Sequence, residues 1–267
     1  MYIRVEPRKR SFRSSNLPKV AIVAALEREI APLVKGWSAT TAQHEGREFT
    51  FYQSNYAVVV CGGIGPEAAR RAAEAVVVKY SPDVLISAGV AGALVPELHV
   101  GETIFPVTVI DIQGGSRHET AIKYALVANT PLARTTLASY PQVAGVKQKQ
   151  QLAKSYGAHA VDMEAAAIAL AAQVHGLAFL AIKSISDEHD FELPEMSRFI
   201  RDGQFLIAKF AIHVGLRPWL WLSFYRLARN SRIASENLCA WLRESALTNT
   251  IVTHSTGGDA RASNPDG

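Results

Sequence analysis

Short apolar runs alternate along the chain with segments whose apolar residues recur at helical spacing. Residues 19–25 form a compact apolar run, and apolar positions from Ile30 to Val34 then follow every three or four residues. This pattern predicts a strand followed by a helix. Residues 47–53 and 56–61 form two further extended runs, which predict a pair of strands arranged like a hairpin.

Glycine and proline mark the next boundaries. Residues 62–66, Gly-Gly-Ile-Gly-Pro, open an alanine-rich segment that predicts a helix as far as Lys79, with proline in its first turn. A strand is expected at 84–88, and it leads into the glycine-containing segment 89–93. The strand should therefore end where these glycines begin.

The middle of the chain continues the alternation. Residues 103–110 are extended, whereas the polar stretch 113–120 has no periodicity and is expected to be a flexible flap. Asp162 is a suitable N-cap for a helix over 163–175, and 177–183 reads as another buried strand. Strands alternating with amphipathic helices predict a single-domain α/β fold, a three-layer α/β/α sandwich around a central mixed sheet.

Composition and charge add domain boundaries to this picture. The 267 residues are 48% hydrophobic and 19% charged, and the net charge of +4 is concentrated at the ends. We expect a disordered basic leader at 1–17, one domain at 18–215, a basic amphipathic helical extension at 216–247 and a disordered tail at 248–267. The leader has no apolar core of a secretory signal, and no window is apolar enough to span a membrane. A cytoplasmic protein is expected.

The extension combines aromatic with basic residues and has two interpretations. Such a helix can lie at a membrane surface, or it can pack on the domain or on a second copy of the chain. No nucleic-acid-binding motif accompanies its charge. The residues concerned are Trp219, Trp221, Phe224, Arg226, Arg229 and Arg232.

Two carboxylates are expected at one end of the sheet. Glu164 falls in the first turn of one predicted helix, and Asp187 comes just past the strand that follows it. Cleavage of a glycosidic bond needs two such acids, one near the sugar and one that protonates the leaving group. Gly89 and Gly92, at the carboxyl end of a central strand, would let a ligand approach the backbone closely.

Two other chemistries fit less well. The Gly63-Ile64-Gly65 segment satisfies a loose dinucleotide-binding pattern, but the next strand has its acid, Asp83, at the wrong end. Asp187, His189 and Asp190 lack the spacing of a zinc or calcium site. We therefore expect no cofactor and no metal.

Six motifs occur in the order seen in the nucleoside phosphorylase superfamily. Over residues 18–212 the chain resembles this superfamily and, more narrowly, its methylthioadenosine/S-adenosylhomocysteine nucleosidase branch. The motifs are Ala25-Leu26-Glu27-Arg28-Glu29, Gly63-Ile64-Gly65, Gly89-Val90-Ala91-Gly92-Ala93, Val100-Gly101-Glu102, Val161-Asp162-Met163-Glu164-Ala165 and Ile185-Ser186-Asp187.

The resemblance implies roles for individual residues. Glu29 would orient or deprotonate the attacking water, and Glu164, backed by Met163, would hold the ribose hydroxyls. Asp187, supported by Ser186, would protonate N7 of a purine, which requires desolvation or a neighbouring carboxylate to keep it neutral. Four backbone positions would line the substrate site: Gly65, Gly89, Val90 and Gly92.

The resemblance implies a homodimer or larger homo-oligomer with a nucleoside substrate. Val90 stands where relatives often carry Ser or Thr, and no arginine stands out as a phosphate ligand, so hydrolysis is favoured over phosphorolysis. A non-catalytic nucleoside-binding relative is the other alternative, against which the retention of all three acids argues.

The sequence does not identify the 5′ group of the substrate. The region between Ile110 and Val161 is shorter than in the methylthioadenosine enzymes and is closer to the hopanoid-associated phosphorylase branch. The candidates are methylthioadenosine, S-adenosylhomocysteine and a lipid-linked adenosine.

Overall fold

The computed structural model describes residues 20–121, 134–192 and 221–247, and between them 199–201, 203–206, 209–210, 213, 215, 217 and 219. The predicted leader and tail lie outside the described residues. No helix among these residues combines the length and the hydropathy that crossing a bilayer requires.

Strands and helices alternate through most of the described chain. Their bounds, in chain order, are β1 (Val20–Ala24), α1 (Glu27–Val34), β2 (Ser38–His44), β3 (Arg47–Gln53), β4 (Ala57–Cys61), α2 (Pro66–Tyr80), β5 (Val84–Ala93), β6 (Thr103–Ile104), β7 (Thr108–Asp111), β8 (Arg117–Glu119), β9 (Thr136–Ser139), α3 (Val146–Tyr156), β10 (Ala160–Asp162), α4 (Ala165–His175), β11 (Ala178–Asp187), β12 (Ile200–Arg201), β13 (Gln204–Phe205) and α6 (Trp221–Leu247).

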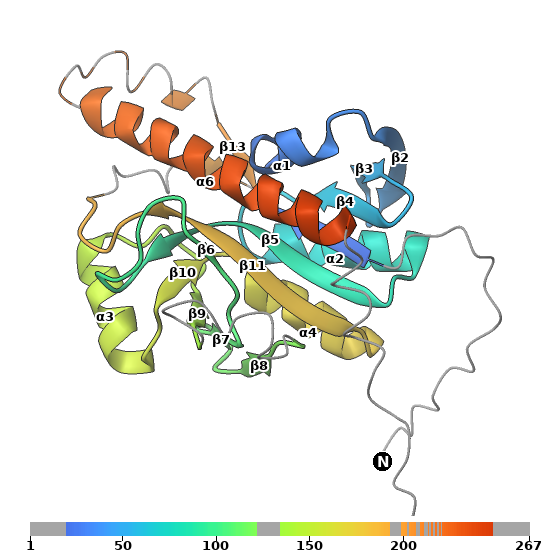
Figure 1. The fold of residues 1–267 in the computed structure, drawn as a ribbon, viewed down its shortest axis with the longest axis horizontal. Helices are drawn as coiled ribbons and strands as arrows, with labels where there is room; N and C mark the ends of the chain where they lie inside the picture. Colours follow the sequence, from blue (N-terminus) through green and yellow to red (C-terminus); the bar gives the residue numbers. More distant parts are fainter. Residues whose placement is uncertain are drawn as a thin grey trace, which may run out of the picture.

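The sheet at the centre of the molecule is mixed (Figure 1). Strand β1 lies between β4 and β5 and is parallel to both, and β11 runs parallel to β5. Antiparallel pairs join β3 to β4 and β10 to β5. Because parallel strands end at the same edge of a sheet, β1, β5 and β11 bring their carboxyl ends together.

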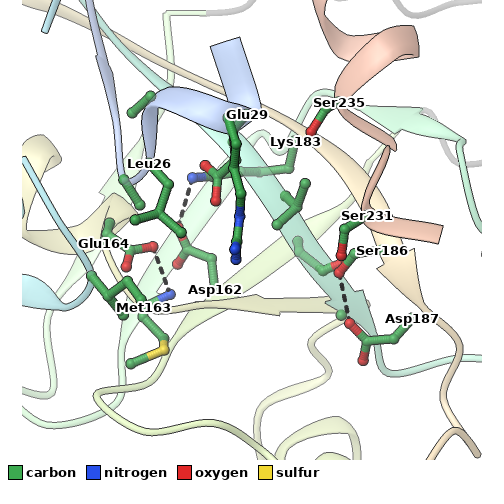
Figure 2. Close-up of a pocket in the computed structure, with 18 of the residues that line it drawn as sticks. Leu26, Glu29, Asp162, Met163, Glu164, Lys183, Ser186, Asp187, Ser231 and Ser235 are labelled. Carbon is green, nitrogen blue, oxygen red and sulfur yellow. Dashed lines mark hydrogen bonds and ion pairs between the residues drawn. The ribbon is translucent and has the colours of Figure 1, made fainter. Parts of the chain in front are cut away.

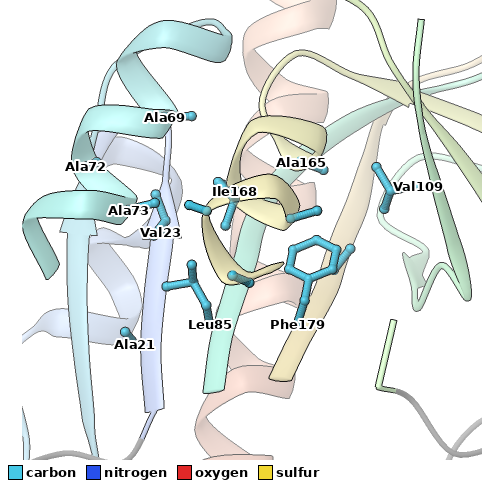
Figure 3. Close-up of a cluster of buried hydrophobic side chains, with 14 of the residues drawn as sticks. Ala21, Val23, Ala69, Ala72, Ala73, Leu85, Val109, Ala165, Ile168 and Phe179 are labelled. Atoms are coloured by element: carbon cyan, nitrogen blue, oxygen red, sulfur yellow. The ribbon is translucent and has the colours of Figure 1, made fainter. Parts of the chain in front are cut away.

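Alternate residues of the central strands enter two separate cores. Ala21 and Val23 of β1 pack with residues of α2 and α4 on one face (Figure 3). Val20 and Ile22 pack with residues of α1 and α6 on the other. Since side chains alternate along a strand, each face is covered by its own helices. This confirms the predicted α/β/α sandwich with a central mixed sheet.

The segment predicted as extended over 103–110 is divided between β6 and β7. Three boundaries beside the candidate site also differ from the prediction. Strand β5 continues through the glycine segment to Ala93, because β11 and β10 pair with it there. Strand β11 runs on to Asp187, so this acid belongs to the strand. Helix α4 begins at Ala165, and Asp162 lies in β10, although its carboxylate accepts the Ala165 N–H at 2.9 Å.

The prediction of a flexible flap at 113–120 is wrong. Its residues include β8, which pairs antiparallel with β7. Exposed strand β2 was not predicted either; its register is set by backbone pairing with β3 across a turn in which Glu45 and Gly46 have positive φ. Neither strand has an apolar face of its own, so hydrophobic periodicity cannot reveal it.

Helix α6 closes the second core. Its later turns bury Ala234, Leu238, Cys239 and Leu242 against the sheet and α1. Its first turns leave large side chains in solvent: Trp221 is 54% exposed and Tyr225 68%. The helix therefore packs on the domain through its second half.

Leu238 gives a direct test of this packing. We expect Leu238→Ala to lower the free energy of unfolding by about 3 kcal/mol, because the side chain is fully buried and its loss leaves a cavity. Urea denaturation measures the change. Leu222→Ala on the same helix, where leucine is 60% exposed, is the control and should change stability by less than about 0.5 kcal/mol.

Candidate active site

A cavity of about 710 Å³ lies where β1, β5, β10 and β11 end. Residues of α1, α3 and α6 complete its walls. Its volume falls within the range of about 300–1,000 Å³ that is usual for small-molecule sites. The cavity therefore occupies the place at which an open α/β sheet typically binds its ligand.

Lys183 stands at the centre of one side of the cavity, and three carboxyl groups surround it. Its ammonium lies 2.9 Å from Oδ2 of Asp162, and both side chains are almost fully buried. Figure 2 shows Glu29 and Glu164 on the same side of the pocket. Burial alone would lower the pKa of Lys183, but Asp162 and Glu164 outweigh it and the pKa is raised. The lysine therefore stays charged, as a counterion for the acids.

Glu29 lies in the first turn of α1, directly after β1. Removal from water raises its pKa to about 7, while Lys183, Arg28 and backbone hydrogen bonds oppose the shift. Glu27, two residues earlier, is exposed and accepts the Tyr52 hydroxyl at 3.0 Å. Of the two acids that follow β1, only Glu29 enters the cavity, and its pKa suits exchange of a proton near neutral pH.

Glu164 is held by backbone groups at the start of α4. One carboxyl oxygen accepts the Gly65 N–H at 2.8 Å and the other accepts the Met163 N–H at 3.3 Å. Desolvation and the charge of Asp162 raise the pKa of Glu164 to about 7. Gly65 does not itself line the cavity among the described residues, so it acts on the site through Glu164.

Two buried oxygen atoms on the cavity wall have no protein partner among the described residues. They are Ser87 Oγ and Asp162 Oδ1. A buried polar atom without a partner is costly, so both positions are polar points in an otherwise satisfied wall. They lie on β5 and β10, beside the Lys183 cluster.

Asp187 and Ser186 reach the cavity together because β11 is irregular there. The register with β5 shifts between Ile185 and Asp187, and such a bulge redirects side chains that would otherwise alternate. The Ser186 hydroxyl donates to Oδ1 of Asp187 at 2.7 Å. Figure 2 shows this pair on the opposite side of the pocket from Glu164.

Asp187 has a buried lysine as its neighbour. The ammonium of Lys149 contacts Oδ2 of Asp187. Desolvation is present, since Asp187 is 5% exposed. Burial is one of the two environments expected for this acid, and Lys149 is a charged neighbour that the sequence did not predict.

The glycines of β5 make room for the acids. A Cβ on Gly89 would lie 3.1 Å from Glu29 Oε2, and one on Gly92 would lie 2.8 Å from Asp187 Oδ2. Gly89, Val90 and Gly92 all line the cavity. These two glycines therefore leave space for protein carboxylates in addition to any ligand.

The cavity also contains residues that the sequence did not point to. Arg28 lines it, although no arginine stood out from the sequence as a phosphate ligand, and apolar and polar residues of α6 form another wall. The sequence does contain a signal for Lys183, because a lone lysine inside an apolar strand needs a buried partner. The sequence contains no such signal for Lys149, since α3 contains several lysines and glutamines of which only this lysine is buried.

Sequence comparison finds relatives among known proteins. The chain is 29% identical over 206 residues to a 5′-methylthioadenosine/S-adenosylhomocysteine nucleosidase of Shewanella halifaxensis, covering 66% of this chain and 89% of that protein. A nucleosidase of the same name from Shewanella baltica is 26% identical over 204 residues, covering 66% and 86%.

Solved structures share the fold. Futalosine hydrolase of Helicobacter pylori superposes with a TM-score of 0.63 at 20% identity, over 88% of this chain and all of that one. A 5′-methylthioadenosine nucleosidase of Arabidopsis thaliana gives 0.66 at 18% identity, over 91% and 98%.

The sequence profile of the phosphorylase superfamily matches residues 19–139 and 119–209, which is most of the chain. These ranges include every strand that ends at the cavity and all the acids described above. The chain belongs to the phosphorylase superfamily.

Proposed function

We propose that this protein is a purine nucleosidase that hydrolyses the N-ribosidic bond of a 5′-substituted adenosine and releases adenine. The observation that carries the proposal is one cavity with Glu29 and Glu164 at one side and Asp187 at the other. Breaking this bond leaves positive charge on the sugar and negative charge on the base, so acids on both sides can assist. The names of the relatives support the same activity.

On the sugar side, Glu29 accepts a proton from the attacking water. Its pKa of about 7 leaves a substantial fraction ionised at neutral pH. Glu164, which lines the cavity, accepts hydrogen bonds from the ribose hydroxyls. The carboxylates around Lys183 also stabilise the positive charge that develops on the ribose.

On the base side, Asp187 donates a proton to N7 of the purine while the bond to the sugar breaks. Ser186 holds one oxygen of the carboxyl group through its hydroxyl. A base that leaves as a neutral molecule departs more readily than an anion, so this proton transfer lowers the barrier.

The second candidate is phosphorolysis. Arg28 lines the cavity beside Glu29, and a guanidinium can bind a phosphate nucleophile. Val90 supplies no hydroxyl to such an anion, which favours water. Hydrolysis therefore remains the first proposal.

The nucleophile and the 5′ group are tested together. We expect purified protein to release free base without phosphate from at least one of methylthioadenosine, S-adenosylhomocysteine, adenosine, inosine and a long-chain 5′-alkyl adenosine. Chromatography of the base, with and without phosphate, is the measurement. Strict dependence on phosphate would select the phosphorylase, whereas no release from any nucleoside would contradict both activities.

Replacing Glu29 should affect activity and stability in opposite directions. We expect Glu29→Gln to lower kcat by about 10² to 10⁴-fold, because the amide cannot accept the proton from water. The substitution should also raise the free energy of unfolding above pH 7 by up to about 3 kcal/mol, since the buried amide stays neutral.

The direction of this stability change follows from the raised pKa of Glu29. The wild-type folded state loses stability as pH rises from about 4.5 to about 7, because ionising the buried carboxyl costs more than ionising it in the unfolded chain. Urea midpoints of the two proteins should therefore agree near pH 4.5 and diverge by pH 8. A Glu29→Gln protein with wild-type turnover would remove Glu29 from the mechanism.

The first turns of α6 support a further proposal, contact with an anionic lipid surface. Trp219, which precedes the helix, is 72% exposed and Leu222 60%, and the exposed Arg226 and Arg229 follow them. Aromatic residues with interspersed arginines suit an anionic interface. The same helix forms the far wall of the cavity, so a lipid-linked nucleoside could pass from the bilayer to the site.

Vesicle binding tests this contact. We expect the protein to co-sediment with phosphatidylglycerol vesicles more than with phosphatidylcholine vesicles, and Trp219→Ser/Trp221→Ser to lose this binding. Tyr156→Ser, which changes a 38% exposed aromatic residue on another helix, is the control. Absence of binding to anionic vesicles contradicts the proposal. A dimer in sedimentation equilibrium that the double variant dissociates would instead assign the surface to a second copy of the chain.

A further inference from the structure

Lys149 is the one buried lysine of the base side of the cavity among the described residues, and the mechanism above does not use it. It lies in the first turn of α3, and its side chain is 1% exposed. Burying an ammonium is costly unless it is paired and hydrogen-bonded. Its position inside the cavity wall therefore needs an explanation.

Among the described residues, the Lys149 ammonium donates its hydrogen bonds to the segment that carries Asp187. Its ammonium donates to Oδ2 of Asp187 and, at 2.7 Å, to the carbonyl oxygen of Glu188. The Ser186 hydroxyl holds the other oxygen of Asp187. Both oxygens of this carboxyl group are thus fixed by buried donors, which sets the direction in which it faces the cavity.

Gly92 supplies the space for this pair. A Cβ there would lie 2.8 Å from Asp187 Oδ2 and 3.4 Å from Lys149 Cε. The first of these distances is too short for any side chain without movement of the acid. Strand β5 therefore has no side chain at the point where β11 and α3 bring the two charges together.

We propose that Lys149 is a positioning residue for departure of the base, acting through Asp187. The inference rests on the proposed nucleosidase activity. In the step concerned, the C1′–N9 bond breaks and its electron pair stays on the purine. The O–H bond of Asp187 breaks and its proton goes to N7. The water oxygen bonds to C1′, and the proton of the water goes to Glu29.

The ammonium stabilises the product of this transfer. Asp187 changes from a neutral acid to a carboxylate inside a buried site, where an uncompensated charge is costly. Lys149 is already hydrogen-bonded to it and keeps that bond in both states, so no group has to move as the charge appears. Preorganised charge of this kind typically contributes about 10² to 10³ in rate for a single donor.

The test compares two leaving groups. The purine of 5′-methylthioadenosine needs a proton, whereas the 4-nitrophenolate of 4-nitrophenyl β-D-ribofuranoside leaves without one. We expect Lys149→Met to lower kcat on the first by about 10²-fold with KM changed less than about threefold, and to lower the rate on the second less than about fivefold. Lys149→Arg, which keeps the charge, should restore part of the loss.

Matched variants make the result specific. Lys147→Met changes an exposed lysine of the same helix and should behave as wild type. Gly92→Ala should show the same selective loss, because its Cβ displaces the pair without removing a charge. If Lys149→Met does not fold by circular dichroism, Gly92→Ala and Lys149→Arg provide the comparison.

Failure of the inference is distinct from failure of the proposed activity. A wild-type protein that releases no base contradicts the activity itself. If the wild-type protein is active, an equal loss on both substrates in Lys149→Met, or a kcat above about one third of the wild-type value on methylthioadenosine, overturns the role of Lys149. A loss confined to the purine substrate supports it.

Discussion

The charge of Lys183 is the constraint on which the sugar side of the site depends. Asp162, Glu29 and Glu164 come from β10, α1 and the start of α4. Burying these three acids together requires a cation between them. Lys183 meets this need from the middle of β11. The lysine does not offset the burial completely: desolvation raises the pKa of Glu29 and of Glu164, and repulsion from Asp162 adds to the rise for Glu164. The elements that carry these acids fix their positions, whereas Glu29 and Glu164 can gain or lose a proton near pH 7.

Strand β11 links the two sides of the cavity. Lys183 organises the acids of the sugar side, and Ser186 and Asp187 follow on the same strand after the shift in register. Because β11 pairs with β5 along its whole length, the separation between the two sides is set by backbone geometry rather than by loops. The glycines of β5 follow from the same arrangement, since each lies against an acid that the neighbouring elements bring in.

Sequence patterns predicted the parts of this structure that have a periodic apolar face. Strands β1, β3, β4, β5 and β11 and helices α1, α2, α4 and α6 were predicted, and the layered fold followed from them. The short buried strands β9 and β10 and helix α3 were not predicted. The exposed strand β2 and the short strand β8 were missed because backbone pairing defines them. The role of Lys149 was hidden for a different reason: which of several similar lysines is buried depends on how α3 sits against β11, and that contact joins residues 38 positions apart.

Helix α6 closes the second core with Leu238 and Leu242 and lines the cavity with its earlier turns. The walls of the site thus come from residues as far apart as Val23 and Glu236. On the ribosome, the strands and acids emerge before the helix that completes the cavity. A nascent chain that lacks α6 has its charged groups but an open site and an uncovered apolar sheet face. Catalytic competence and protection from aggregation should then arrive in the same late event of synthesis, the docking of the last described helix.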